Sequence, residues 1–185
     1  DFISTAQASA YNQADLTTLP GKPVSVGDPV SSTVPDPSDP DTETADGTFT
    51  AHQTSPRDIT LDYTHLDPDD FNFLSFAFVG LQALDTLTLA LTIPAAQRLK
   101  IEFTDKNKKK ARFYAEGDGT QHNYTFDLTN PDFVPPGFLR DALTGFHLVT
   151  DQARMGDSGQ IVLETKNLDF ISTAQASAYN QADLT

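Results

Sequence analysis

Apolar and polar residues alternate in short runs along most of the chain, and this period of two limits the fold more than any other sequence feature. The run Phe71–Val79 (FNFLSFAFV) is the strongest example, and Leu87–Leu91 alternates leucine with threonine and alanine. Successive side chains of a β-strand point to opposite faces, so each run predicts a short strand. Turn signals such as Asp105–Lys109 and Glu116–Gly119 separate the runs. We therefore expect an all-β fold, an antiparallel β-sandwich of about eight strands.

The run Phe71–Val79 changes the parity of its apolar residues. Phe71 and Phe73 share one face of the expected strand, whereas Leu74, Phe76 and Phe78 share the other. This pattern predicts either a bulge near Leu74 or a central strand that is buried on both faces. Aromatic runs of this kind on several strands favour two facing sheets with an aromatic core.

The ends of the chain repeat one another. The sequence DFISTAQASAYNQADLT occurs as Asp1–Thr17 and again, without a difference, as Asp169–Thr185. Three explanations are open: the chain is a window on a tandem array of similar units, it is engineered, or one copy completes the fold of another molecule. The array is favoured because the second copy begins inside the last expected strand, Ile161–Ser172, rather than at an element boundary.

This interpretation predicts four segments. Residues 1–5 would be the tail of a preceding unit's last strand, and residues 173–185 would start the next connector. Residues 47–172 would form the sandwich. Residues 6–46 would be an acidic, extended connector, because six of the 12 prolines lie in Pro20–Pro40 and Lys22 is the only basic residue before position 47. The chain starts in mid-pattern, so we expect a piece of a longer protein.

The charge and cysteine content narrow the expected partners. The net charge is -14, which disfavours nucleic acid and anionic membranes as ligands. There is no cysteine and no apolar run near the ~20 residues that cross a membrane, so we expect neither disulfides nor membrane insertion. Seven of the 12 basic residues lie in Arg98–Arg112; this basic turn either attracts a neighbouring copy or is a solvated hairpin tip. An extracellular or cell-surface location fits this composition.

Five stretches in this order carry a family resemblance: FLSFAFVG, LKIEFTDKNKKKARFYAEG, HNYTFDLTN, FLRDALTGFHLVTD and GQIVLETKNLDFIS. Over about Thr48–Ser172 the chain resembles the galactose-binding-like jelly roll of many carbohydrate-binding modules. The resemblance is one of pattern and contains no diagnostic motif. It implies a jelly-roll β-sandwich, whose function must still be argued from a site.

The resemblance also implies candidate sites. Members that bind sugar usually stack it on Trp or Tyr, and this chain has no Trp. The best candidates lie on what we expect to be adjacent strands: Arg112, Tyr114, Gln121, His122 and Tyr124. A structural role is the alternative for each, since Tyr is a common half-buried strand residue. Family members also often hold a structural calcium ion near the first and last strands. Carboxylates that could bind it, although without EF-hand spacing, are those of Asp67, Asp69, Asp70 and Asp169.

Common signatures of catalysis are missing from the sequence. It has no G-x-S-x-G motif and no phosphate-binding loop, and its four histidines are dispersed, unlike the ligands of a zinc site. The two carboxylates of Glu116–Gly119 lie on an expected tight turn rather than in a cleft. We therefore expect a protein that is not an enzyme and that needs no cofactor, apart from the calcium ion considered above.

Two functions remain open. The first is a structural repeat unit of an extracellular fibre, stalk or sheath, whose partners are neighbouring copies joined by the connector and by β-strand addition. Its inter-unit contacts would be Phe2, Ile3, Tyr11, Phe170, Ile171 and Tyr179. The alternative is a carbohydrate-binding module, repeated for avidity in an adhesin or a polysaccharide-degrading enzyme. The lack of Trp favours the first function.

Overall fold

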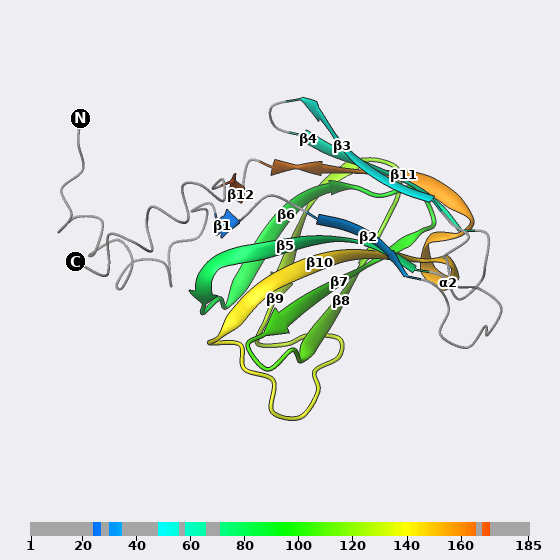
Figure 1. Ribbon diagram of the computed structural model, residues 1–185. Helices are drawn as coiled ribbons and strands as arrows, with labels where there is room; N and C mark the ends of the chain where they lie inside the picture. Colours follow the sequence, from blue (N-terminus) through cyan, green and yellow to red (C-terminus); the bar gives the residue numbers. More distant parts are fainter. Residues whose placement is uncertain are drawn as a thin grey trace, which may run out of the picture.

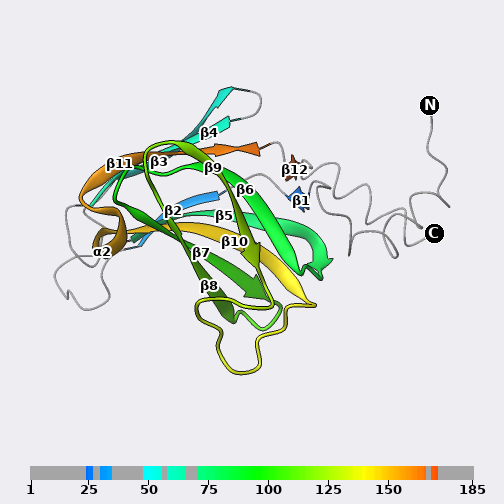
Figure 2. The same cartoon turned by 180° about the vertical axis from the view of Figure 1, so that it is seen from behind.

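The computed structural model describes residues 24–26, 30–34, 48–55, 58–65, 71–165 and 168–170. These ranges contain twelve β-strands and one short helix, α2 (Gln152–Met155). The strands form two sheets that pack face to face, shown from opposite sides in Figures 1 and 2. The expected all-β sandwich is therefore confirmed, with more strands than expected. None of the helices in the described ranges is long and apolar enough to cross a membrane.

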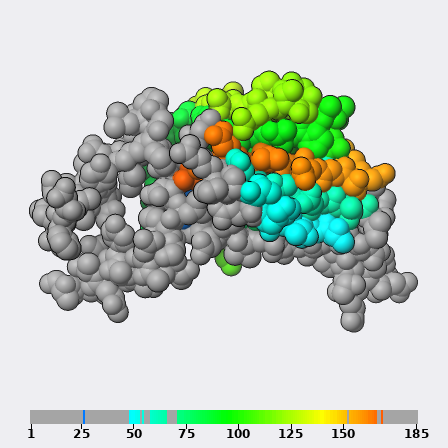
Figure 3. Space-filling view, turned by 90° about the horizontal axis from the view of Figure 1, so that it is seen from above, coloured from blue at the N-terminus to red at the C-terminus, as the bar shows by residue number. Residues whose placement is uncertain are grey.

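One sheet has seven strands and the other has five. The order in the seven-stranded sheet is β12 (Leu168–Phe170), β1 (Val24–Val26), β5 (Phe71–Gln82), β10 (Leu143–Asp151), β7 (Arg98–Asp105) and β8 (Lys110–Glu116), with β2 (Val30–Val34) also beside β5. The order in the five-stranded sheet is β3 (Thr48–Ser55), β4 (Asp58–Thr64), β11 (Ser158–Glu164), β6 (Thr86–Thr92) and β9 (Gln121–Asp127). Figure 3 shows the outer side of the five-stranded sheet, from cyan β3 and β4 through orange β11 to yellow-green β9. Among the described pairings, only β1 with β12 is parallel.

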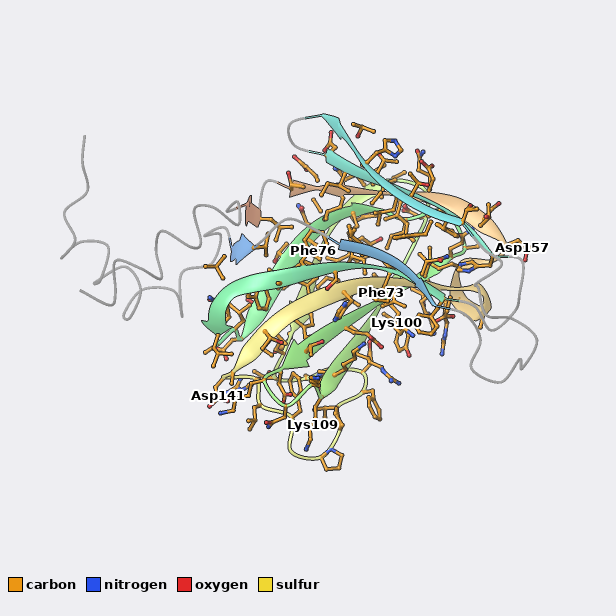
Figure 4. All side chains as sticks on the ribbon, viewed as in Figure 1. Phe73, Phe76, Lys100, Lys109, Asp141 and Asp157 are labelled. Carbon is orange, nitrogen blue, oxygen red and sulfur yellow. The ribbon has the colours of Figure 1, made fainter. Side chains whose placement is uncertain are left out.

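An aromatic core joins the two sheets. Phe76 of β5 stacks on Phe146 of β10 with ring centroids 4.7 Å apart, and Phe76 is labelled in Figure 4. Phe103 of β7 lies 5.9 Å from Phe146 and 6.3 Å from Phe126, which comes from β9 in the opposite sheet. These side chains are buried, so the apolar rows of both sheets supply the main stabilisation by removing ring surface from water.

Strand β5 contains no bulge near Leu74, where the sequence allowed one; its buried and partly buried residues alternate regularly. Its pairing with β10 runs without interruption from Phe71 to Ala77, and the register shift falls later, between Gly145 and Leu143 of β10. Leu74 is buried and Phe73 is only partly buried. The second expectation, a central strand buried on both faces, holds only in part: β5 is central in its sheet, but its outer face is partly exposed. Phe71 and Phe73 therefore lie on the side of the sheet away from the core.

The turn Glu116–Gly119 carries the chain from one sheet to the other, because β8 and β9 are edge strands of different sheets. The Gly117 N–H donates to the Gln97 carbonyl at 2.7 Å. A β-carbon at position 117 would collide with the carbonyl oxygen of Pro94 and with Ile93, so only glycine fits here. The turn itself was expected, but the crossing between sheets was not.

Part of the expected connector belongs to the sandwich. Val24–Val26 and Val30–Val34 lie within residues 6–46, yet both pair with β5 as strands. Their sequences, VSV and VSSTV, are rich in β-branched residues, which favour strands despite the prolines around them. The boundaries proposed for the other segments stay predictions.

The range expected to form one last strand, Ile161–Ser172, contains parts of two strands: β11 ends at Glu164 in the five-stranded sheet, and β12 lies in the seven-stranded sheet. Asp169 and Phe170 pair with Ser25 and Val26 of β1, and Leu168 is buried in the core. Asp1–Ser4, for which the equivalent place in a preceding unit was predicted, lies outside the described residues. So do the other proposed inter-unit contacts, Phe2, Ile3, Tyr11, Ile171 and Tyr179.

Candidate functional site

Alternate side chains of β5, β10, β7 and β8 point away from the core and form a surface that we name the outer face. The strand registers arrange them in rows that cross the sheet, and the two central rows are Phe73, Val149, Lys100, Tyr114 and Ser75, His147, Glu102, Arg112. Neighbouring strands lie ~4.8 Å apart, so a row of four spans roughly 14 Å. Figure 4 labels Phe73 and Lys100, which belong to the same row. The outer face thus offers aromatic and charged groups side by side.

Glu102 is surrounded by three cations at the centre of this face. Its Oε2 accepts a hydrogen bond from Lys110 Nζ at 2.7 Å, while its Oε1 lies 3.3 Å from Arg112 Nε and 3.9 Å from Lys100 Nζ. Only 7% of the Glu102 side chain is exposed. Burial raises the pKa of Glu102, but the hydrogen bond from Lys110 and the three positive charges outweigh burial and hold the pKa below its ordinary value. Glu102 is therefore an ionised anchor that orients the cations.

Phe71 and Phe73 form an aromatic platform on β5. They are two residues apart on the same side of the strand, with ring centroids 6.5 Å apart and ring planes 27° from parallel. Lys100 Nζ lies 5.9 Å from the centroid of Phe71, and His147 meets Phe73 edge-on at 5.4 Å between centroids. Both phenylalanines are partly exposed. Two nearly parallel rings next to charged donors suit an extended ligand with apolar and polar sides.

Tyr114 carries two guanidinium groups over its ring. The guanidinium carbon of Arg154 in α2 lies 4.7 Å from the ring centroid, and that of Arg98 in β7 lies 5.8 Å away. Arg98 also pairs with Glu116. The backbone N–H of Tyr114 donates to Asp132 Oδ2 at 2.9 Å, which fixes the strand edge beneath the ring. This end of the outer face therefore presents cations rather than a bare aromatic ring.

His147 lies in the same row as Glu102 and is partly buried. Its Nε2 is 3.1 Å from Thr104 Oγ1, and its buried Nδ1 has no hydrogen-bond partner among the described residues. Burial lowers the pKa of His147, and the charge of Lys110 lowers it further, while Glu102 acts in the opposite direction. The imidazole is therefore neutral near pH 7 and adds no charge to the cluster.

The structure separates the sequence-derived glycan candidates into two groups. Arg112 and Tyr114 lie on β8, on the outer face, and the Arg112 guanidinium covers the Phe133 ring at 5.0 Å. Gln121 and Tyr124 lie, together with His122, on β9 in the other sheet, so the expectation that all five candidates share adjacent strands is wrong.

Gln121 and Tyr124 also point to opposite sides of their own strand. The Gln121 side chain donates to Glu164 Oε2 at 3.3 Å on the outer side of the five-stranded sheet. Tyr124 packs against the core and donates its hydroxyl to the Glu116 carbonyl at 2.7 Å. His122 lies 2.8 Å from Asp118 Oδ2, in an exposed pair. Tyr124 therefore has the structural role that was the alternative to glycan binding: it connects the two sheets.

The calcium candidates cannot be placed as a cluster. Asp67, Asp69 and Asp70 lie outside the described residues, and Asp169 is described only through its backbone pairing in β12. In the part of the chain that the structure describes, no three carboxylates or histidines come together as metal ligands do. Calcium at these four positions stays a prediction.

Six residues of the outer face and α2 were not predicted as site residues from the sequence: Phe71, Phe73, Lys100, Glu102, His147 and Arg154. A signal for the first two was present: their parity is opposite to that of the core residues in the same strand. Glu102 gave no signal, because a single acid between apolar residues of a strand reads as an ordinary solvent-facing position.

Comparison with known proteins adds information on the fold alone. No protein-family model and no curated protein matches the chain. Among solved structures it is similar to a family 11 carbohydrate-binding module of the cellulosomal cellulase Lic26A-Cel5E of Clostridium thermocellum, with 13% identity and a TM-score of 0.51, covering 74% of this chain and 84% of that one. A family 30 module of the cellulase Cel9D-Cel44B from the same organism has 11% identity and a TM-score of 0.47, covering 63% and 79%. A family 29 carbohydrate-binding module has 11% identity and a TM-score of 0.46, covering 83% and 98%.

The alternating aromatic runs predicted two facing sheets with an aromatic core, and the structure has both. The resemblance implied a jelly-roll β-sandwich, and all described pairings except that of β1 with β12 are antiparallel. The chain thus has the jelly-roll β-sandwich fold found in carbohydrate-binding modules.

Proposed function

We propose that this protein is a carbohydrate-binding module and that the outer face of its seven-stranded sheet is the binding surface. The observation that carries the proposal is the pair of partly exposed, nearly parallel rings of Phe71 and Phe73 beside the charged row around Glu102. A sugar ring has an apolar C–H side that packs on an aromatic face, and hydroxyl groups that hydrogen-bond to charged side chains. Such a polysaccharide would be met outside the cell, in keeping with an extracellular location.

Binding rather than catalysis fits the carboxylates on the molecule. A glycoside hydrolase needs a carboxylic acid whose pKa is raised, so that it can donate a proton near neutral pH. Among the described carboxylates with a resolved shift, every pKa moves downward, including that of Glu102 and that of Asp118, which falls to about 2. Hydrogen bonds and nearby cations hold these groups in the ionised form, which does not suit them to donating protons.

The proposal is tested by replacing Phe73 with leucine, which keeps apolar volume but has no aromatic face. We expect the affinity for a polysaccharide ligand to fall by about 1–2 kcal/mol, or roughly 5- to 30-fold, in isothermal titration or affinity electrophoresis. Thr88→Ala, on the outer side of the five-stranded sheet, is the control and should bind like the wild type. Unchanged binding by Phe73→Leu, with binding lost in Thr88→Ala, would place the ligand on the other face.

A second candidate function is a structural repeat, and the duplicated seventeen residues favour it. The second copy supplies part of β12, which pairs with β1 at the edge of the sheet. A copy of the same residues in a neighbouring unit could make the same pairing, so consecutive units could be linked by strand addition. The two functions are compatible, because repetition of a weak binding module increases avidity. Light scattering separates them: a chain that stays monomeric at high concentration and binds polysaccharide argues against assembly as its task.

A further inference from the structure

Positive charge is strongly segregated in this acidic protein. Of the nine Lys and Arg residues in the described ranges, eight lie on β7, on β8, in the turn between them or in α2. The exception is Arg140, in a loop that contacts the β7–β8 turn through the Leu139 N–H bond to Asp105. It pairs with Asp85, beyond the end of β5 that is remote from Phe71. The strands of the five-stranded sheet contain no Lys or Arg, although they carry Asp58, Asp62, Asp127 and Glu164. The β7–β8 edge of the seven-stranded sheet, with its turn and α2, is thus the basic side of a molecule with a net charge of -14.

The acids on the outer face do not neutralise its cations. Glu102 is one carboxylate among Lys100, Lys110 and Arg112, and the further acid within ion-pair distance of these three is Asp151, 3.4 Å from Lys100. The local cluster therefore carries an excess of positive charge in the part of the chain that the structure describes. Because only 7% of the Glu102 side chain is exposed, a ligand would meet the positive charge of the surrounding cations rather than the carboxylate.

Arg154 adds a cation that has no acidic partner within ion-pair distance among the described residues. Its guanidinium lies over the Tyr114 ring at 4.7 Å. Aromatic contact orients a guanidinium while leaving its N–H groups free to donate in pairs to a planar or tetrahedral anion. Lys100 stands opposite Tyr114 in the strand register and 5.9 Å from the Phe71 ring. The aromatic platform, Lys100 and Arg154 thus follow one another across the sheet.

We propose that the ligand of the outer face is an anionic polysaccharide, one whose sugar rings carry carboxylate or sulfate groups. A ring would pack on Phe71 and Phe73, and its acidic group would bind between Lys100 and Arg154. This inference rests on the proposed carbohydrate-binding function and adds the charge of the ligand to it. The acidic remainder of the molecule repels polyanions and so restricts such a ligand to this face.

The choice of a polysaccharide over nucleic acid follows from the same charge balance. Nucleic acid binding depends on many Lys and Arg contacts to a dense row of phosphates. Here the described cations gather on β7, on β8, in the turn between them and in α2, and the strands of the opposite sheet carry only acids among their Asp, Glu, Lys and Arg residues. A neutral sugar backbone with widely spaced charges suits an aromatic platform beside two cations.

The experiment compares defined probes by affinity electrophoresis and titration calorimetry, at low salt and at physiological salt. Polygalacturonate and alginate supply carboxylates, carrageenan supplies sulfates, and agarose and a mixed-linkage β-glucan are neutral. Short DNA and anionic lipid vesicles complete the panel. We expect at least one anionic polysaccharide to bind more tightly than the neutral ones, with an affinity that decreases as salt screens the charges. Binding to the carboxylate or the sulfate arm identifies which acid the face recognises.

Two variants assign the effect to the proposed residues. Arg154→Gln should weaken binding of the anionic probe about tenfold, the loss expected for a hydrogen bond to a charged group. Arg140→Gln removes a charge of the same kind beside Asp85, at the end of β5 remote from Phe71 and α2, and should leave binding unchanged. Equal, salt-independent binding of neutral and anionic polysaccharides, unaffected by Arg154→Gln, would overturn this inference and leave the carbohydrate-binding function standing. Binding of no polysaccharide, or stronger binding of DNA or vesicles, would overturn both.

Discussion

Replacing Glu102 with glutamine tests the anchor on which the outer face depends. The substitution keeps the size of the side chain but removes the carboxylate charge that pairs with Lys110 and Arg112. Loss of one partner from a fully buried ion pair costs about 3–5 kcal/mol. Here the partners are partly solvated, since the side chains of Lys110 and Arg112 are 42% and 43% exposed, and this screening reduces the cost. We expect the free energy of unfolding to fall by about 1–3 kcal/mol at pH 7, measured by urea denaturation.

Glu116→Gln is the matched control. Glu116 lies on the same pair of strands and also pairs with a cation, Arg98, but its side chain is 64% exposed. Exposed ion pairs contribute little to stability, so the control should unfold like the wild type. The comparison therefore isolates the effect of burial on the stability contributed by the ion pair, because the two glutamates have the same charge, lie on the same strand pair and each pair with cations.

The pH dependence supplies a second test of the same substitution. The cations hold the pKa of Glu102 below its ordinary value in the folded protein, so its contribution is complete above the unfolded pKa of about 4.3 and disappears as the pH falls through the folded pKa. The stability difference between wild type and Glu102→Gln should therefore shrink below about pH 4. A variant as stable as the wild type at pH 7, or a difference that persists undiminished at pH 3, would refute the reasoning.

Two further predictions concern residues around the outer face. The buried carboxylate of Asp105 accepts backbone N–H groups of Asn107, Lys109 and Leu139 at 2.8–2.9 Å, so Asp105→Ala should lower the free energy of unfolding by roughly 2–4 kcal/mol; denaturation at wild-type urea concentrations would contradict this. In an NMR titration the imidazole of His147 should show a pKa below its ordinary 6.5, because burial and Lys110 disfavour its charged form, and Lys110→Gln should move that pKa upward. A His147 pKa at or above 6.5 would contradict the prediction, because burial and Lys110 would then not disfavour the charged form.

Alternation in the sequence predicted most of the sandwich, because a strand with one buried face leaves a period of two in its residues. The same period of two also determines which side of a strand each candidate site residue faces. Gln121 and Tyr124 are separated by an odd number of positions on β9 and so must face opposite sides. Phe71 and Phe73 have the parity opposite to Leu74 and must face away from the core.

Other features depend on contacts between residues far apart in the chain. The turn at Gly117 has the composition of a hairpin, and only packing shows that it connects two sheets. Val24–Val26 becomes a strand because the edge of β5 is available to it, although prolines surround it. The cluster around Glu102 combines β7 and β8 in one register, and a shift of one residue would break it.

The most direct test of the account maps the bound ligand onto the two faces. Amide chemical shifts would be recorded by NMR during titration with an anionic oligosaccharide cut from the best-binding polysaccharide. We predict that the largest changes fall on β5, β10, β7, β8 and α2, including the amides of Phe73 and Lys100, while the five-stranded sheet stays unchanged. Changes confined to β3, β4, β11, β6 and β9 would show that the outer face is not the binding surface.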